Sequence, residues 1–221
     1  MPNDNYPLIG LFGGTFDPVH YGHLRAALEV CQSLKLKELR FIPAGQPVHR
    51  PAPIASAAHR IAMLELAIAE ILQFTIDKRE INSAEPSYTV NTLLSLRQEL
   101  PHAALCLLVG VDAFAAITTW HRWQDILMLA HLIVLQRPGF TLPSPDEVGG
   151  LLARQISDKK ELAKATHGAI WVETITPLAI SSTLIRNQLA IGNIPYFLLP
   201  QSVINYSKEH QIYKESQLLC T

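Results

Sequence analysis

The segment 13–23, GGTFDPVHYGH, holds the residues best suited to chemistry. Gly13 and Gly14 follow an apolar run typical of a buried strand, and glycines let a backbone approach an oxygen-rich ligand closely. His20 and His23 are three residues apart, so a helix would present both on its first turn, where unpaired N–H groups and the helix dipole favour an anion. The pattern predicts a phosphate site in which both histidines stabilise charge developing on phosphorus.

On the residues alone, this segment could also be an ordinary turn or a metal site. A glycine-rich turn after a strand is common, and two histidines at helical spacing could bind a metal ion. A transition metal would need further ligands, and Cys31, Cys106 and Cys220 are scattered without ligand spacing. We therefore expect no protein metal ligand. Asp17 before Pro18 predicts a turn and the entry to a helix, because aspartate accepts from backbone N–H groups.

A second helix start is predicted near Ser181 and Ser182, either of which is a natural N-cap. Arg186 then falls within about one turn of the cap, where a cation opposes the helix dipole at a cost of up to about 1 kcal/mol unless an anion binds there. The alternative is an exposed arginine paired with a nearby carboxylate. On the residues alone, a bound phosphate and a paired surface arginine both stay open for this segment.

Two further segments could contact a nucleotide. Gly110 and Asp112 follow an apolar run, and ligands of open α/β sheets lie beyond the carboxyl ends of the strands. Asp112 could accept hydrogen bonds from ribose hydroxyl groups or cap the following helix. Trp120 and Trp123 have helical spacing, which is usual for core residues, but one indole face could stack on a flat ring. We expect Trp123 in the core.

Apolar, strand-like runs alternate with helical patterns along the chain. The runs are 8–12, 39–42, 74–76, 105–109, 132–135 and 170–172, and the helical patterns are 24–34, 57–71, 90–99, 123–130 and 183–190. Such alternation predicts a Rossmann-like α/β fold, doubly wound, with a mainly parallel sheet and helices on both faces. We expect one domain over residues 1–221, with 1–6 and 214–221 as frayed ends.

Composition excludes several classes of function. The 221 residues are 48% hydrophobic with a formal net charge of −1, so no basic surface for a nucleic acid is expected. No apolar run reaches membrane-spanning length, and no signal sequence begins the chain, so we expect a cytoplasmic protein that does not bind membranes. Three cysteines form no disulfide framework.

Taken together, these segments resemble the nucleotidyltransferases that carry a His-x-Gly-His motif, here His20 to His23. Within that superfamily the chain is similar to the bacterial nicotinate-mononucleotide adenylyltransferases, from Leu8 to about His210. The resemblance implies transfer of AMP from ATP to nicotinate mononucleotide, giving nicotinate adenine dinucleotide and pyrophosphate in NAD biosynthesis. Nicotinamide mononucleotide and pantetheine phosphate remain alternative acceptors, and a non-catalytic nucleotide sensor is the alternative of another class.

The resemblance also assigns roles to residues. It implies catalytic roles for His20, His23 and Arg186, and Mg²⁺ bound through the phosphates of ATP. It implies contacts to ATP from Gly13, Gly14, Thr15, Phe16, Asp17, His20, His23, Gly110, Asp112, Arg137, Ser181, Ser182, Thr183 and Arg186. It implies contacts to the acceptor from His49, Arg50, Ser87, Tyr88, Thr89 and Trp120, of which Trp120 would stack on the nicotinate ring.

The chain departs from the family pattern in the loop before His49. Val48 replaces a proline, and Ala44 and Gly45 stand where relatives often carry an asparagine. We expect these changes to affect one hydrogen bond to the acceptor and not the chemistry. Assembly into a homo-oligomer is compatible with the sequence.

Overall fold

The computed structural model describes residues 5–48, 51–137, 139 and 141–214. A six-stranded sheet runs through the molecule, with all strands parallel and in the order β3-β2-β1-β4-β5-β6. The strands are β1 (Leu8–Gly14), β2 (Glu38–Pro43), β3 (Phe74–Ile76), β4 (Ala104–Gly110), β5 (His131–Gln136) and β6 (Ile170–Thr174). The strand order reverses between β1 and β4, which makes this a doubly wound α/β sheet.

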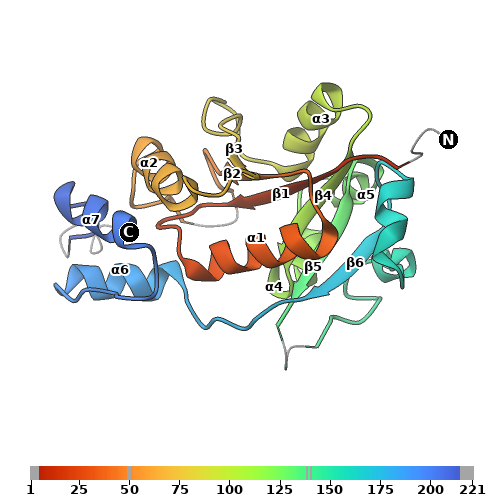
Figure 1. Ribbon diagram of the computed structural model, residues 1–221. Helices are drawn as coiled ribbons and strands as arrows, with labels where there is room; N and C mark the ends of the chain where they lie inside the picture. The colour runs from red at the N-terminus through yellow and green to blue at the C-terminus, as the bar shows by residue number, and fades with distance from the viewer. Residues whose placement is uncertain (1–4, 49–50, 138, 140, 215–221) are drawn as a thin grey trace.

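Helices connect the strands and extend the fold beyond the sheet. They are α1 (Tyr21–Leu34), α2 (Ala57–Ile68), α3 (Thr89–Glu99), α4 (Val111–Ala115), α5 (Ile126–Leu129), α6 (Ser182–Ala190) and α7 (Gln201–Glu209), with 3-10 helices at Ile117–Thr119, Trp123–Asp125, Leu151–Arg154 and Lys159–Lys164. In Figure 1, α6 and α7 lie at the same end of the molecule, and α2 packs against α7.

The sheet is buried on both faces, as its apolar strands require. In β4 the first six residues are all buried, because a parallel strand between two helical layers meets apolar side chains on each side. One core cluster joins the sheet to α1, α2, α6 and α7, and the other joins it to α3, α4 and α5. Alternate residues of β4 belong to different clusters: Leu105 and Leu107 to the second, Cys106 and Leu108 to the first.

The predicted fold class is confirmed, and all six predicted strands are present. The helical patterns also correspond to helices, but α2 ends at Ile68 and the pattern 123–130 divides into a 3-10 helix and α5. The sequence did not predict α7, although Val203 and Ile204 of that helix are buried in the core. None of the helices in the described residues is long and apolar enough to cross a membrane.

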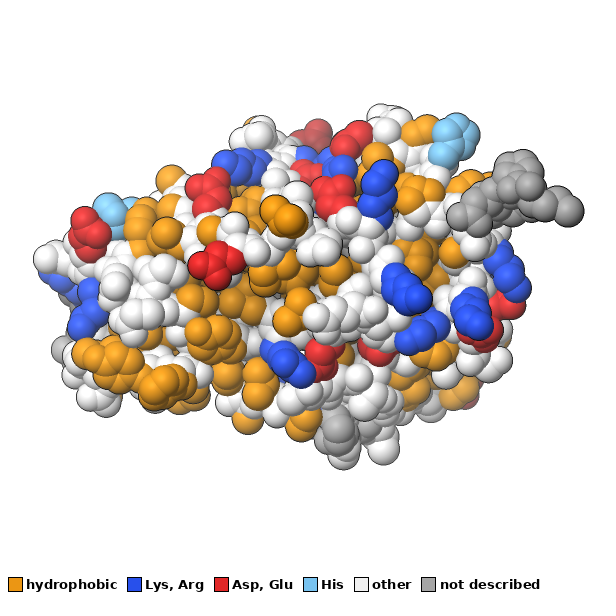
Figure 2. Space-filling model, in the orientation of Figure 1, with side chains coloured by type: hydrophobic (Ala, Val, Ile, Leu, Met, Phe, Trp, Pro, Cys, Tyr) orange, Lys and Arg blue, Asp and Glu red, His pale blue; other side chains and the backbone are white. Residues whose placement is uncertain are grey.

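Charged side chains are interspersed over the described part of the face in Figure 2, and no field of one sign covers it. This distribution agrees with a net charge of −1. Large exposed apolar side chains are scattered over the described residues, with Leu72 the most exposed at 96%; three of them, Ile191, Tyr196 and Phe197, follow α6.

Candidate active site

The candidate site lies where the strand order reverses. β1 pairs with β2 on one side and with β4 on the other. Because the strands are parallel, their carboxyl ends at Gly14, Pro43 and Gly110 reach the same edge of the sheet. Open α/β sheets bind ligands outside this edge. The segments that follow these strands are therefore the candidates for a nucleotide site.

The loop after β1 is in direct contact with the N-terminus of α6. Nη1 of Arg186 donates a hydrogen bond to the carbonyl oxygen of Asp17 over 2.7 Å, and the Ser182 hydroxyl donates to the carbonyl oxygen of Pro18 over 3.0 Å. Nη2 of Arg186 also reaches the Thr183 hydroxyl oxygen at 3.3 Å. Two segments from opposite ends of the chain thus form one local surface.

The N-terminus of α6 is capped by a serine and carries a cation. Ser181 is the N-cap, since its hydroxyl accepts from the N–H of Leu184 at 3.2 Å, and Ser182 is the first helical residue. Arg186 forms no ion pair with a carboxylate among the described residues, and its buried Nε has no hydrogen-bond partner there. The alternative considered for the sequence, an exposed arginine paired with a carboxylate, is therefore not observed among these residues. A guanidinium held near a helix N-terminus favours an anionic ligand.

His20 and His23 are stacked face to face at the start of α1. Their ring centroids are 3.7 Å apart and their planes differ by 24°. His20 is buried, with only 5% of its surface exposed, and its Nδ1 has no hydrogen-bond partner in the described part of the chain. A buried polar atom without a partner costs about 1–3 kcal/mol, so such atoms are often found at functional sites.

Gly22, between the two histidines, makes room for the His20 ring. A Cβ atom at Gly22 would lie 2.9 Å from both Cε1 and Nδ1 of His20, which is closer than real Cβ contacts. This contact gives a physical reason for the glycine of the His-x-Gly-His motif. Burial, and after it the positive charge of Arg137, lowers the pKa of His20 from 6.5 to about 4. His20 is therefore neutral at pH 7.

The N-terminus of α1 is left open by its own side chains. His20 occupies the N-cap position but makes no side-chain capping bond, and the first turn contains no acidic residue. Among the first N–H groups, that of Tyr21 donates to the Leu198 carbonyl oxygen over 2.9 Å. The positive end of the helix dipole is thus not neutralised by an internal carboxylate, which favours a bound anion.

Asp17 and Pro18 form the predicted turn, but Asp17 does not begin the helix, whose N-cap is His20. Its buried carboxylate accepts from the N–H groups of Ile54 (2.7 Å) and Ala55 (3.1 Å) and from the hydroxyl of Tyr213 (2.8 Å). The residue type was interpreted correctly as an acceptor of backbone N–H groups, but its partners come from the segment before α2. The buried Asp17 carboxylate therefore stabilises the loop by connecting it to the segment before α2 and to Tyr213.

Phe16 also turns away from the edge of the sheet. Its side chain is 1% exposed and packs in the core against Phe12, Phe41 and His23. Only the backbone atoms of Phe16, whose φ is +50°, could contact a ligand. The loop turns sharply at this residue, which directs the side chain inward.

The other residues predicted to contact ATP lie at the carboxyl ends of the strands. Gly13 is exposed, and a Cβ atom there would meet nothing within 4 Å, so the space above it is open. Gly110 is the N-cap of α4, and Asp112 is an exposed residue of the first turn rather than the cap. Arg137 follows β5 and is exposed, close enough to His20 to influence its pKa.

The predicted acceptor residues come from two neighbouring segments. Tyr88 is the N-cap of α3 and Thr89 its first residue. The Tyr88 ring lies 4.4 Å from the ring of His121, measured between centroids, so the segment before α3 and the segment around Trp120 are adjacent. Trp120 is half-buried against the second core cluster, as is Trp123. His49 and Arg50 lie outside the described residues.

Two residues that the sequence did not identify stabilise the loop after β1. Arg60 of α2 is 2% exposed and donates from Nη1 to the carbonyl oxygen of Thr15 over 2.9 Å. Tyr213 is buried on the other side and donates to Asp17. The sequence offered one signal for Arg60, which stands on the otherwise apolar face of the helical pattern 57–71. An arginine is rarely fully buried unless it has a partner, so this position indicates a buried hydrogen bond.

The described residues contain no cluster of three or more His, Cys, Asp or Glu that could hold a metal ion. The side chains around the loop after β1 are histidine, arginine, serine and threonine, which do not form an oxygen cage for a hard cation. A divalent cation at this site would need ligands from the nucleotide itself.

The low pKa of His20 predicts a loss of stability in mild acid. The folded pKa of about 4 lies below the unfolded value of 6.5, so the unfolded chain binds the extra proton and stability falls as the pH drops through this window. Between pH 7 and pH 5 we expect the free energy of unfolding to lose about 2 kcal/mol through this residue. Chemical denaturation of the wild type and of His20→Asn at both pH values measures it. Equal losses in the two proteins would contradict the assignment.

Comparison with known proteins identifies the family. Residues 11–188 match the model of the family described as cytidylyltransferase-like. The chain is 46% identical over 208 residues to a protein of Methylococcus capsulatus named "Probable nicotinate-nucleotide adenylyltransferase", covering 93% of this chain and 99% of that one. A protein of Pseudomonas syringae pv. tomato with the same name is 48% identical over 208 residues, covering 93% of each chain.

Solved structures show the same fold. The nicotinic acid mononucleotide adenylyltransferase of Plasmodium falciparum complexed with NaAD superposes with a TM-score of 0.72 at 18% identity, covering 94% of this chain and 98% of that one. The same enzyme complexed with APC gives a TM-score of 0.71 at 17% identity, with the same coverage. With its fold, its site and its relatives in agreement, the chain belongs to the cytidylyltransferase-like family, among the nicotinate-nucleotide adenylyltransferases.

Proposed function

We propose that this protein transfers AMP from ATP to nicotinate mononucleotide, releasing pyrophosphate and forming nicotinate adenine dinucleotide for NAD biosynthesis. The observation that carries the proposal is the contact between the loop after β1 and the N-terminus of α6, made by Arg186 and Ser182. Relatives that are 46% and 48% identical over nearly their whole length carry the name of this activity.

The proposed ATP site lies between the two helix N-termini. The N-terminus of α1, which no side chain caps, and Ser181 to Arg186 of α6 would hold the triphosphate. Gly13 leaves open space for the nucleotide, and Gly110 with the exposed carboxylate of Asp112 would contact the ribose. The exposed Arg137 would add positive charge near the phosphates.

The proposed acceptor site lies across the switch point from α6. Ser87, Tyr88 and Thr89 stand at the N-terminus of α3, next to the segment of Trp120. N–H groups at a helix N-terminus suit the nicotinate carboxylate, and an indole face suits the flat pyridine ring. His49 and Arg50 are proposed from the sequence to bind the acceptor phosphate.

The reaction needs positioning more than acid–base chemistry. An oxygen of the acceptor phosphate, already ionised near neutral pH, forms a bond to the α-phosphorus of ATP. The bond from that phosphorus to the oxygen bridging to the β-phosphorus breaks, and pyrophosphate leaves with the electron pair. Neutral His20 would donate a hydrogen bond to a phosphate oxygen as its charge grows, with Arg186 as the fixed cation.

Mg²⁺ is proposed to enter with ATP, bound to phosphate oxygens and water. The described residues fit this arrangement because they supply no acidic cluster of their own. Bound in this way, the ion would neutralise part of the triphosphate charge and favour departure of pyrophosphate.

A panel of acceptors tests the proposed function. The protein is incubated with ATP, Mg²⁺ and either nicotinate mononucleotide, nicotinamide mononucleotide or pantetheine phosphate, and pyrophosphate release is followed. We expect the highest kcat/KM with nicotinate mononucleotide. Faster release with another acceptor would reassign the substrate, and binding of ATP without release by any acceptor would indicate a nucleotide sensor.

Replacing Trp120 should weaken acceptor binding if its indole stacks on the pyridine ring. We expect Trp120→Ala to raise the KM for nicotinate mononucleotide about tenfold and Trp120→Phe about twofold, since aromatic stacking contributes about 0.5–1.5 kcal/mol. The KM for ATP should stay unchanged. Trp123→Phe is the matched control, because Trp123 packs against the same core cluster. An equal KM in Trp120→Ala and wild type would remove Trp120 from the acceptor site.

The remaining features stay predictions from the sequence. These are a single domain over residues 1–221, a location in the cytoplasm, the lack of a nucleic-acid partner and assembly into a homo-oligomer.

A further inference from the structure

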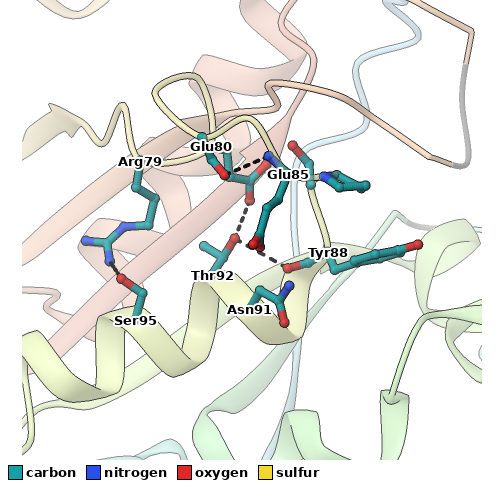
Figure 3. Close-up of a pocket in the computed structure, with 10 residues that line it drawn as sticks. Arg79, Glu80, Glu85, Tyr88, Asn91, Thr92 and Ser95 are labelled. Atoms are coloured by element: carbon teal, nitrogen blue, oxygen red, sulfur yellow. Dashed lines mark hydrogen bonds between the residues drawn. The ribbon is translucent and has the colours of Figure 1, made fainter.

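The carboxylate of Glu80 lies beside two hydroxyl-bearing residues of the proposed acceptor region, Thr92 in α3 and Ser87 before it. Thr92 in α3 donates from Oγ1 to Oε1 of Glu80 over 2.6 Å. The nearby Ser87 hydroxyl acts to lower the pKa of the same carboxylate. Figure 3 shows the Thr92 side chain between Glu80 and the carbonyl oxygen of Tyr88, which lies 3.5 Å from Oγ1. Burial is the main cause that raises the pKa of Glu80.

Ser87 connects Glu80 to the loop after β2. Its hydroxyl oxygen accepts from the N–H groups of Gly45 at 3.0 Å and Gln46 at 3.1 Å, and its own N–H donates to the Gln46 carbonyl oxygen at 2.9 Å. A serine hydroxyl has one proton and two acceptor sites. With both acceptor sites used by backbone N–H groups, the hydroxyl proton is left to interact with the Glu80 carboxylate, whose pKa this hydroxyl acts to lower.

Gly45 brings the same loop against the backbone of Glu80. A Cβ atom at Gly45 would lie 2.1 Å from the carbonyl oxygen of Glu80, so a residue with a side chain could stand here only if the backbone moved. Gly45 is one of the positions at which the sequence departs from its family pattern.

We propose that Glu80 is a positioning residue for the acceptor. Through Ser87 and Thr92 it fixes the segment 86–89 at the N-terminus of α3 relative to the loop 44–48, whose continuation carries His49 and Arg50. The inference rests on the proposed function, because Ser87, Tyr88 and Thr89 of the first segment are proposed to hold nicotinate mononucleotide. Glu80 acts through these residues and not by contact with the substrate, since its carboxylate accepts from Thr92 and lies beside the Ser87 hydroxyl.

Glu80→Gln tests the proposal with little change in shape. Glutamine keeps one oxygen but replaces the other with an NH₂ group, which cannot accept from a hydroxyl. One of the two hydroxyl groups then loses its ideal acceptor. We expect the KM for nicotinate mononucleotide to rise about tenfold, which is the effect of losing one such buried hydrogen bond, while kcat and the KM for ATP stay within about twofold.

Two further variants separate positioning from general stability. Ser87→Ala should raise the same KM, and the double variant with Glu80→Gln should be no worse than the more affected single variant, because both changes break one connection. Ser95→Ala is the matched control: Ser95 lines the same pocket but bonds to Nη1 of Arg79, outside this network (Figure 3). Melting temperatures and titration of nicotinate mononucleotide accompany the kinetics.

The outcomes are distinct. Selective loss of acceptor affinity in Glu80→Gln and Ser87→Ala, with Ser95→Ala unchanged, supports the proposal. An unchanged acceptor KM in folded Glu80→Gln, or equal changes in both substrate KM values, overturns it while the proposed function stands. If the wild type neither binds nicotinate mononucleotide nor releases pyrophosphate with it, the proposed function fails, and this inference fails with it.

Discussion

Replacing His20 with alanine is expected to lower kcat about a thousandfold while the affinity for nicotinate mononucleotide stays within about twofold of wild type. The ring is buried at the N-terminus of α1, stacked on His23, and neutral at pH 7. The ring N–H of His20 would donate a hydrogen bond to the phosphate oxygen whose negative charge grows during transfer. Loss of the ring therefore raises the reaction barrier more than it weakens substrate binding in the ground state. Steady-state pyrophosphate release and acceptor titration measure the two quantities separately.

His102→Ala serves as the control, because His102 is an exposed histidine that precedes β4 and so lies at the opposite edge of the sheet. Its kcat should equal that of wild type. Near-normal turnover in His20→Ala would remove His20 from the chemistry and leave the open helix terminus as the source of charge stabilisation.

Replacing Arg186 with glutamine is expected to lower kcat/KM for ATP about a hundredfold. The guanidinium connects the loop after β1 to α6 through the Asp17 carbonyl oxygen, so its loss removes a cation and leaves only the Ser182–Pro18 bond described above between the two proposed phosphate-binding segments. Arg186→Lys keeps the charge but cannot form two hydrogen bonds with the same fork, and we expect it to recover only part of the activity. Kinetics with varied ATP measure the effect.

Arg154→Gln is the matched control at an exposed arginine of a 3-10 helix. It should leave kcat/KM for ATP unchanged. If Arg186→Gln raised the KM for nicotinate mononucleotide and left that for ATP unchanged, the arginine would belong to the acceptor site, and the assignment of α6 to ATP would be wrong.

The fold could be predicted from the sequence because its signals are local. Continuous apolar runs such as those of β4 and β5 are typical of strands buried on both faces, and their alternation with helical patterns leaves few topologies. α7 was missed because its apolar residues are few, although Val203 and Ile204 are buried against the first core cluster. Tertiary packing, rather than local propensity, forms that helix.

The candidate site could be predicted only where one segment carries the whole signal. The histidines at a helix start and the serine cap of α6 have such signals. The direction of a side chain within a loop has no local signal in the sequence, because it depends on partners far along the chain. Asp17 therefore bonds to Ile54, Ala55 and Tyr213 instead of capping the helix. The bond from Thr92 to Glu80 could not be predicted from the sequence for the same reason.

A crystal structure with a non-hydrolysable ATP analogue tests the central claim most directly. The account predicts that one triphosphate chain contacts both helix N-termini, with its oxygens within hydrogen-bonding distance of His20 and of the Thr183 and Arg186 side chains. A triphosphate bound at only one of these helices, or away from the edge where β1 and β4 end, would contradict the account.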